Sequence, residues 1–448
     1  MSALALLDAY RSRRVSPLEV FDAVASRLEQ TVESGAFVTL DLDNARTAAR
    51  QAEVAYTDES AERPPLLGVP IAVKDCFDTR DLTTTYGSPI FATHVPSADA
   101  RCVTRLRKAG AILVGKTSMY EFAWGITSDN LLPGATANPW DRRRTAGGSS
   151  SGSALAVALD LVPLAVGSDT AGSIRLPAAW CGIVGHRPTH GRVDAGGTFP
   201  LAPSLDTAGP LARTPADARL LLDILSGREV PATTKRPSQL RIGYWPGPAD
   251  APVSGDVASV TMAALAVLDD LGEPVVEVAL PTGRLLEAFQ SIQLAEALGV
   301  HRSRGLFPDH REDYSPALAE RLEQAGQLTR ADADSAARQR EELRAAFKCV
   351  FERVDVVVAP AAPTTAPLVE DARHQELRDR VLSYTVPASL AGIPACAVRA
   401  GFDRGGLPVG LQILGSWGCD DLVLEIACRF FDATPAVQDT QFQTKAAT

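Results

Sequence analysis

The sequence lacks the features that mark secreted, membrane-spanning and disulfide-rich proteins. Its seven cysteines are scattered and form no CxxC pair, which disfavours a disulfide scaffold and predicts reduced thiols in the cytoplasm. No run reaches the roughly 18 uninterrupted apolar residues of a transmembrane helix. Near the N-terminus the arginines follow a short apolar run, the reverse of a secretory signal. We therefore expect a cytoplasmic protein with no membrane partner.

Positive charge is scarce as well. The chain of 448 residues has 44 Lys and Arg against 54 Asp and Glu, a net charge of −10. A protein that binds phosphate backbones needs clustered positive charge, so no nucleic-acid partner is expected. What the chain does contain, 46% apolar and 22% charged residues, is typical of an ordinary globular protein.

Helix-like and strand-like segments alternate along the chain, which favours an α/β fold. Ser16, Pro17 and Glu19 form a strong helix start, with an N-cap serine, a proline in the first position and a glutamate in the third. Amphipathic patterns predict helices at about 17–30, 41–56, 99–109, 214–226, 254–271, 330–351 and 421–431. Short apolar runs predict buried strands at Val69–Lys74, Ala111–Val114, Val162–Val166, Leu240–Tyr244, Asp355–Ala359, Ala395–Val398 and Val409–Leu414.

Two stretches are rich in turn residues. Gly227–Gln239 lies between two regular segments and is a candidate subdomain boundary. Gly134–Gly152 includes a run of glycines and serines that is followed at once by the apolar helical pattern of Ala154–Leu161. Because a flexible linker would not lead directly into a buried helix, we expect a structured loop at a helix start.

Two short motifs suggest chemistry that their context does not support. The segment Gly110–Thr117 matches the P-loop pattern, but its variable residues favour a buried strand and no strand precedes it. The segment Gly148–Gly152 matches the GxSxG nucleophile elbow, but the residues before it are a poor core strand. The six histidines show neither a distinctive context nor zinc-ligand spacing. We therefore expect no nucleotide site, no Ser-His-Asp hydrolase and no metal.

Lys74 ends an otherwise apolar run in a chain that has only six lysines. Burying an ammonium group is costly unless it is paired or neutral. One interpretation is a structural lysine paired with Asp75 or Asp78. The other is a lysine whose pKa is lowered by desolvation, so that it can take the proton of a serine hydroxyl at neutral pH. Serine-bearing glycine loops follow at Gly147–Ser150 and Gly167–Ser173.

These residues resemble the amidase signature family. The resemblance rests on Lys74, on the loop GGSSSGS that begins at Gly147, and on the long segment Gly167–Val193. It extends to Gly68–Ala123 and Ser204–Arg213, and more weakly to Asp355–Leu414, so that it covers most of the chain. It implies an α/β fold in which a large mixed β-sheet is covered by helices on both faces, in a single amidase domain of residues 1–448.

The resemblance also implies a Ser-Ser-Lys triad of Lys74, Ser149 and Ser173. Ser173 would be the nucleophile that forms an acyl-enzyme, and Ser149 would relay its proton to neutral Lys74 and later to the leaving amine. Ser149 would follow a cis peptide bond from Gly148, whose lack of a side chain makes that backbone sterically tolerable. The oxyanion would bind the backbone N–H groups of Thr170, Ala171, Gly172 and Ser173.

The chain departs from the commoner family pattern at two positions. Ala171 stands where the commoner loop DTGGS has its first glycine, and it fits the loop only if its φ is negative. Ser151 replaces a glycine of the commoner serine loop. Alignment to the family also places Ala123 and Trp124 at the acyl site, whereas a buried core aromatic is the alternative interpretation of Trp124.

The activity that the resemblance implies is hydrolysis of a carbon–nitrogen amide bond in a small-molecule substrate, without a cofactor or metal. The alternative is a glutaminase that supplies ammonia as the A-type subunit of a tRNA-dependent amidotransferase. The segment Tyr314–Phe347 resembles free-standing amidases more than that amidotransferase component. A non-catalytic binding protein on the same fold is disfavoured by the intact triad. A homodimer remains an open alternative to a monomer.

Overall fold

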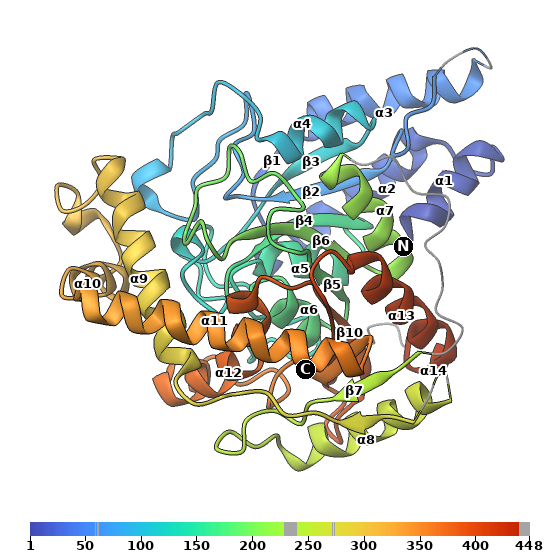
Figure 1. Cartoon of the computed structure of the whole chain (residues 1–448). Helices are drawn as coiled ribbons and strands as arrows, with labels where there is room; N and C mark the ends of the chain where they lie inside the picture. Colours follow the sequence, from blue (N-terminus) through green and yellow to red (C-terminus); the bar gives the residue numbers. More distant parts are fainter. Residues whose placement is uncertain (59, 61, 228–239, 271, 273, 439–448) are drawn as a thin grey trace.

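The computed structural model describes the chain except residues 59, 61, 228–239, 271, 273 and 439–448. The described strands are β1 (Phe37–Leu40), β2 (Pro70–Lys74), β3 (Ile112–Thr117), β4 (Leu164–Asp169), β5 (Val184–Arg187), β6 (Thr207–Ala212), β7 (Ile242–Tyr244), β8 (Val276–Glu277), β9 (Val356–Pro360), β10 (Ala395–Phe402) and β11 (Pro408–Gly415). They form one sheet in the order β1-β3-β2-β4-β6-β5-β10-β11-β9-β7-β8 (Figure 1). Strands β3, β2 and β4 run parallel, as do β9, β7 and β8, and the other neighbours are antiparallel. The predicted large mixed sheet is confirmed.

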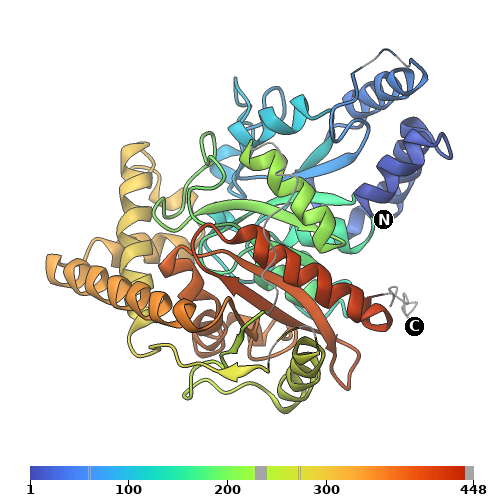
Figure 2. The same ribbon diagram turned by 45° about the vertical axis from the view of Figure 1, so that its right-hand side comes forward.

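Helices cover both faces of this sheet, as predicted (Figure 2). The described helices are α1 (Ala3–Arg11), α2 (Pro17–Gln30), α3 (Leu42–Thr57), α4 (Arg101–Lys108), α5 (Ser151–Ala158), α6 (Arg175–Cys181), α7 (Pro215–Ser226), α8 (Gly255–Asp269), α9 (Leu285–Ser303), α10 (Pro316–Ala325), α11 (Arg330–Arg353), α12 (Gln375–Ala391), α13 (Asp420–Ala433) and α14 (Pro435–Gln438). Helices α5 and α6 pack together on one face, and α7 and α13 pack together on the other.

The helices and strands predicted from local sequence signals agree with those of the structure. All of the predicted helices and strands are present, with boundaries that differ by a few residues. At α2, Ser16 and Glu19 form a complete capping box, and Pro17 occupies the first turn. Helix α5 begins at Ser151, directly after the glycine–serine loop, so the expectation of a structured loop at a helix start is confirmed.

Several elements carry no clear signal in the sequence. Strand β6 contains Gly209 and Pro210 in its six residues, yet it pairs with β4 on one side and β5 on the other. Helix α12 contains Pro387, and the short α6 contains Pro177. Glycine and proline weaken both local patterns, so tertiary packing rather than propensity forms these elements. The candidate boundary at 227–239 lies, apart from Gly227, outside the described residues.

The core lies between the sheet and its helices, and the sheet order decides where polar side chains gather. Strands β2 and β4 pair in parallel, Ile71 opposite Leu164 and Val73 opposite Val166. Their carboxyl ends therefore meet at the same edge of the sheet, the usual place for a site in a parallel sheet.

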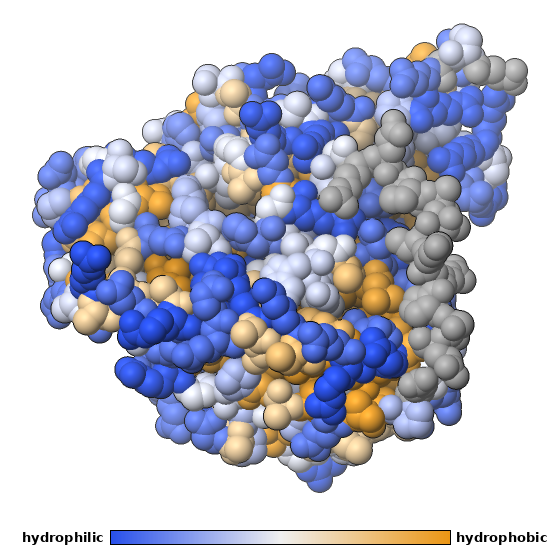
Figure 3. All heavy atoms as spheres, viewed as in Figure 1, coloured by the Kyte–Doolittle hydropathy of each residue, from blue (hydrophilic) through white to orange (hydrophobic). Residues whose placement is uncertain are grey.

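Hydrophilic residues cover most of the face shown in Figure 3. None of the described helices is long and apolar enough to cross a membrane.

Candidate active site

Lys74 is the last residue of β2, and its side chain is fully buried. Its Nζ lies 2.7 Å from Oγ of Ser149 and 2.8 Å from Oγ of Ser168. Among the described residues Lys74 takes part in no ion pair, because Asp75 pairs with Lys116 at 3.0 Å instead. The structural interpretation, in which Lys74 pairs with Asp75 or Asp78, is therefore wrong. The structure places the amine among neutral hydroxyl groups.

These surroundings change the acidity of Lys74. Burial lowers the pKa of Lys74 from 10.5 to about 8, and the more distant negative charges around it oppose this only in part. A neutral amine is a base with one free electron pair, whereas an ammonium has none. The side chain is therefore placed to exchange protons with a hydroxyl group near neutral pH.

Ser149 reaches Lys74 from the glycine–serine loop that precedes α5. The peptide bond between Gly148 and Ser149 is cis, as expected. Only glycine fits at Gly148, because an added Cβ would lie 2.0 Å from the carbonyl oxygen of Thr127. This close approach, together with the φ of +81° at Gly147, explains why two glycines precede the serine.

Ser173 lies just before α6, and it is 5% exposed. Its carbonyl oxygen accepts a hydrogen bond of 3.3 Å from the backbone N–H of Ser150. The two serine loops are thus joined through their backbones. The structure therefore brings all three predicted triad residues to the same region: Lys74 contacts Ser149 directly, and the Ser173 loop adjoins the Ser149 loop.

Asp169 organises the loop between β4 and α6, and sequence reasoning did not single it out. Its carboxylate is fully buried and accepts hydrogen bonds from the backbone N–H groups of Gly172 at 2.8 Å and Ile174 at 3.3 Å. It also pairs with Arg175 and Arg187, each at 3.0 Å. Burial alone would raise the pKa of Asp169, but the two guanidinium groups hold it well below its usual range. The loop is therefore held around a permanent buried carboxylate.

The N–H groups predicted to hold the oxyanion are not equivalent. That of Gly172 is already engaged by Asp169. The N–H groups of Thr170, Ala171 and Ser173 have no hydrogen-bond acceptor among the residues that the structure describes. Gly172 has a φ of +122°, whereas Ala171 is not among the residues with positive φ, so alanine is compatible with this loop.

Ser168 is a second residue that the sequence analysis missed. The strand predicted at Val162–Val166 continues as β4 to Asp169, because Ser168 and Asp169 pair with Ala208 and Thr207 of β6. Ser168 therefore belongs to the sheet and not to the loop. The signal that could have found it is a pair of polar residues at the carboxyl end of an apolar strand.

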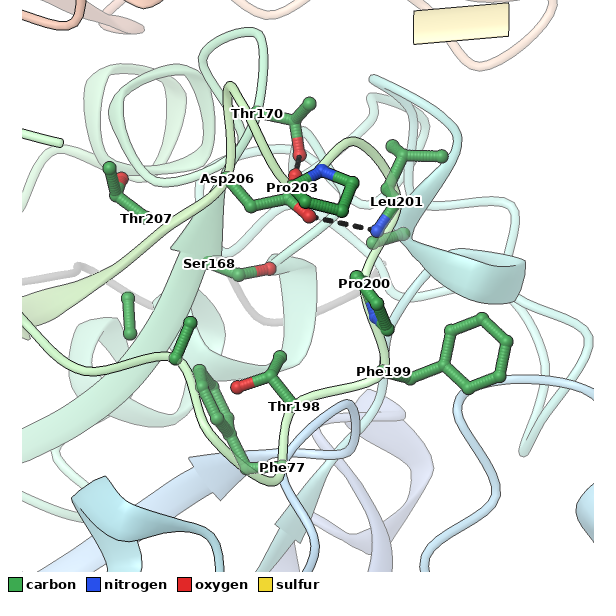
Figure 4. A pocket seen from close by; sticks show the side chains of 13 residues that line it. Phe77, Ser168, Thr170, Thr198, Phe199, Pro200, Leu201, Pro203, Asp206 and Thr207 are labelled. Carbon is green, nitrogen blue, oxygen red and sulfur yellow. Dashed lines mark hydrogen bonds between the residues drawn. The ribbon is translucent and has the colours of Figure 1, made fainter. Parts of the chain in front are cut away.

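A cavity of about 230 Å³ adjoins Ser168 (Figure 4). It is lined by Phe77, Ala123, Ser168, Thr170, Ala195, Thr198, Phe199, Pro200, Leu201, Pro203, Asp206, Thr207 and Ala208. Most of these side chains are apolar, and Asp206 is the only one of them that can carry a charge. Burial raises the pKa of Asp206 to about 6, and its oxygens accept hydrogen bonds from Thr170, Leu201 and Ala202. The cavity is therefore suited to a small, mainly apolar group.

Of the two residues predicted to line the acyl site, Ala123 lines the cavity and Trp124 does not. Ala123 lines the cavity, and its φ is +62° in a short turn where Phe122 also has a positive φ. Trp124 is not among the lining residues; it is buried and donates a hydrogen bond of 3.0 Å from Nε1 to Gln293. This placement favours the interpretation of Trp124 as a core aromatic.

The competing motifs have structural explanations. Ile112–Thr117 is the buried strand β3, preceded by α4 and a turn at Gly110, so the P-loop pattern does not form a phosphate loop. In the GxSxG match, the hydroxyl of Ser150 donates to the carbonyl oxygen of Ser168. Within the described part of the chain, no group of three or more His, Cys, Asp or Glu side chains could hold a metal ion.

Comparison with known proteins agrees with this site. The family model Amidase matches residues 19–424. The A-type subunit of the glutamyl-tRNA(Gln) amidotransferase of Symbiobacterium thermophilum is 35% identical, over 97% of this chain and 97% of its own. A solved amidase is 33% identical with a TM-score of 0.88, covering 96% of this chain and 99% of its own. The solved A-type subunit of the Thermotoga maritima amidotransferase is 28% identical with a TM-score of 0.76, covering 93% and 94%. The chain belongs to the amidase signature family, whose members are enzymes that act on amide bonds.

Proposed function

We propose that the protein hydrolyses the amide bond of a small molecule through an acyl-enzyme on Ser173. The observation that supports this most directly is the fully buried Lys74 amine, 2.7 Å from the Ser149 hydroxyl and without an ion-pair partner among the described residues. A lysine in such surroundings is a proton acceptor rather than a structural charge. The chain acts as a single domain and needs neither metal nor cofactor for this chemistry.

In the proposed reaction, Lys74 takes the proton of Ser149, and Ser149 takes that of Ser173. The Ser173 oxygen then attacks the amide carbonyl carbon. The negative oxygen of the tetrahedral intermediate is held by the backbone N–H groups of Thr170, Ala171 and Ser173, while Asp169 fixes the loop through the N–H of Gly172. The leaving amine receives its proton back through Ser149, and water releases the acid from Ser173 by the reverse route.

Labelling with phenylmethanesulfonyl fluoride tests this assignment. This reagent sulfonylates an activated serine, and peptide mapping identifies the residue. We expect one label, on Ser173, that is absent from Ser173→Ala and much slower to form in Lys74→Met. Ser153→Ala is the matched control, because Ser153 is a buried serine whose hydroxyl bonds to Thr117 and Val166 rather than to Lys74. A label on Ser149, or turnover by Ser173→Ala, would overturn the proposal.

The cavity favours a small neutral amide as substrate. Free glutamine carries an α-carboxylate and an α-ammonium group, and a specific site would present a cation to the first. None of the described residues that line the cavity is an arginine or a lysine. Its volume of about 230 Å³ is below the roughly 300–1,000 Å³ of pockets for drug-sized ligands, which fits a short acyl group.

The second candidate is the A-type component of a tRNA-dependent amidotransferase, which would use glutamine as its ammonia donor. The curated relatives support it more than they support a free-standing amidase. Eight of them carry the name of that component at 34–35% identity over at least 94% of this chain. The solved structures are more divided, since the amidase has a TM-score of 0.88 and the amidotransferase component has one of 0.76.

Glutaminase activity distinguishes the two candidates. The purified chain is assayed with glutamine and with short aliphatic, aryl and carbamoyl amides, alone and after co-expression with the other amidotransferase subunits of the same cell. Hydrolysis of neutral amides by the chain alone supports the first candidate. Glutamine hydrolysis that requires a co-purifying protein supports the second.

The proposed location is the cytoplasm, with which the seven free cysteines are consistent.

A further inference from the structure

The base of the proposed reaction has a second hydroxyl partner that the triad does not include. Nζ of Lys74 lies 2.8 Å from Oγ of Ser168, almost as close as the 2.7 Å to Ser149. Ser168 also lines the cavity, and Figure 4 shows its hydroxyl pointing into it. Among the described residues it is therefore the hydrogen-bond partner of Lys74 that also lines the cavity, whose lining includes neither Ser149 nor Ser173.

The number of donors and acceptors around Nζ assigns a direction to each contact. A neutral amine has one electron pair and two N–H bonds. If Ser149 is to give up its proton, the electron pair must face Ser149. One N–H bond then has Ser168 as its acceptor, and no other acceptor for Nζ is found among the described residues. An ammonium would instead place three N–H bonds against two acceptors.

Ser168 is itself held firmly in place. Its backbone N–H donates to the hydroxyl of Ser150 at 3.3 Å, and its carbonyl oxygen accepts from the same hydroxyl at 3.1 Å. Strand pairing with Ala208 fixes it from the other side. Its own O–H has no acceptor among the described residues, and its oxygen also accepts a contact of 3.7 Å from the Cys76 thiol. A hydroxyl oxygen has two electron pairs, so the one that faces Cys76 leaves the other for an N–H bond of Lys74.

We propose that Ser168 is a positioning residue for Lys74: by accepting one N–H bond from the cavity wall, it turns the electron pair of Nζ toward Ser149. The proposal rests on the proposed function, in which Lys74 is the base. Ser168 takes no proton and forms no bond to the substrate. Its contribution is to keep a long, flexible amine in the one orientation that can accept the proton of Ser149.

The titratable groups around Lys74 leave a clear window for a pH measurement. Those that act on it from the neighbouring elements are Cys76, Asp169 and Asp206. Burial raises the pKa of Cys76 to about 11 and that of Asp206 to about 6, and Asp169 titrates far below these. Burial also lowers the pKa of Lys116 on the adjacent strand β3 from 10.5, so a step between pH 7 and pH 10 in kcat/KM is assigned to Lys74 when it persists in Lys116→Arg.

The test compares Ser168→Ala with Ser168→Thr, which keeps a hydroxyl, and with Ser153→Ala, which removes a buried hydroxyl that bonds to Thr117 and Val166. The substrate is any neutral amide that the wild type hydrolyses. We expect Ser168→Ala to lower the plateau of kcat roughly tenfold, and to move the acid limb of kcat/KM down by about one pH unit, because the ammonium loses an acceptor. Ser168→Thr should restore both values, and Ser153→Ala should show neither change.

Two outcomes would overturn the proposal: an acid limb that Ser168→Ala leaves in place, or a loss of kcat that Ser168→Thr does not restore. Thermal unfolding of each variant shows whether a loss of activity follows from a loss of the fold. The proposed function fails on different evidence, since Ser173→Ala would then remain active while the Ser168 variants could still be compared on the wild-type reaction.

Discussion

Replacement of Lys74 by arginine tests whether Lys74 acts as a base or only as a fixed positive charge. Arginine keeps the positive charge and the hydrogen-bond donors, but its pKa stays above about 12 in proteins, so it cannot take a proton from a serine. If Lys74 is the base, Lys74→Arg should lose kcat/KM by on the order of 100-fold or more, the usual contribution of a general base. Lys74→Met should lose as much.

The structure sets the expected pH profile. Burial lowers the pKa of Lys74 from 10.5 to about 8. At pH 7 about one such side chain in ten is neutral, against about one in three thousand for an unperturbed lysine. Because the neutral amine is the active form, kcat/KM should rise with pH through about 8 and become level above that value. Protonation at lower pH removes the base, so the loss lies on the acid side.

The assay is kcat/KM from pH 5.5 to 10 for the wild type and for Lys74→Arg. Lys116→Arg is the matched control, because Lys116 is an equally buried lysine on the adjacent strand β3, but its partner is the carboxylate of Asp75 at 3.0 Å. Arginine can replace it as a charge, so activity should stay within about tenfold of the wild type. A Lys74→Arg variant within about tenfold of the wild type, or a wild-type profile without a step below pH 10, would refute the reasoning.

Four further predictions concern the candidate site and the loop around Asp169. Ser173→Ala should abolish turnover without unfolding the chain, and EDTA should leave the wild type active; residual activity above a few per cent, or rescue by zinc, would contradict this. Asp169→Asn should lower the free energy of unfolding in urea by about 3–5 kcal/mol, because two buried guanidinium groups lose their counter-charge; an unchanged midpoint would contradict it. Gly172→Ala should lower kcat and stability, since its φ is +122° and the new Cβ would lie 2.7 Å from Oγ1 of Thr385; a fully active, equally stable variant would argue against the loop geometry.

Much of the fold could be predicted because its signals are local. A capping box at Ser16 depends on residues three positions apart, and the apolar runs of β2 and β4 indicate buried strands without any partner. The glycine–serine loop indicated the start of α5 in the same way. Strand β6 gave no such signal, because Gly209 and Pro210 weaken the local pattern and only pairing with β4 and β5 makes it a strand.

The candidate site was likewise predicted only in part from the sequence. The sequence by itself determined that Lys74 and the two serine-bearing glycine loops were the places to examine, because a lysine at the end of an apolar strand is uncommon. The resemblance to the amidase signature family then selected Ser149 and Ser173 within those loops. The sequence left open whether Lys74 is paired with a carboxylate. That question depends on which side chain of a neighbouring strand lies beside Asp75. In the structure Lys116 forms the ion pair with Asp75, so Asp75 is not the partner of Lys74.

Only the tertiary structure decided how these residues work together. The hydroxyl partners of Lys74 lie 75 and 94 positions away along the chain, and the parallel pairing of β2 with β4 brings them to the same sheet edge. The same packing engages the N–H of Gly172 with Asp169, and closes a cavity between Ser168 and the loop that ends at Asp206. Burial, hydrogen-bond partners and the resulting pKa of a side chain are properties of its three-dimensional neighbours, which no local stretch of sequence contains.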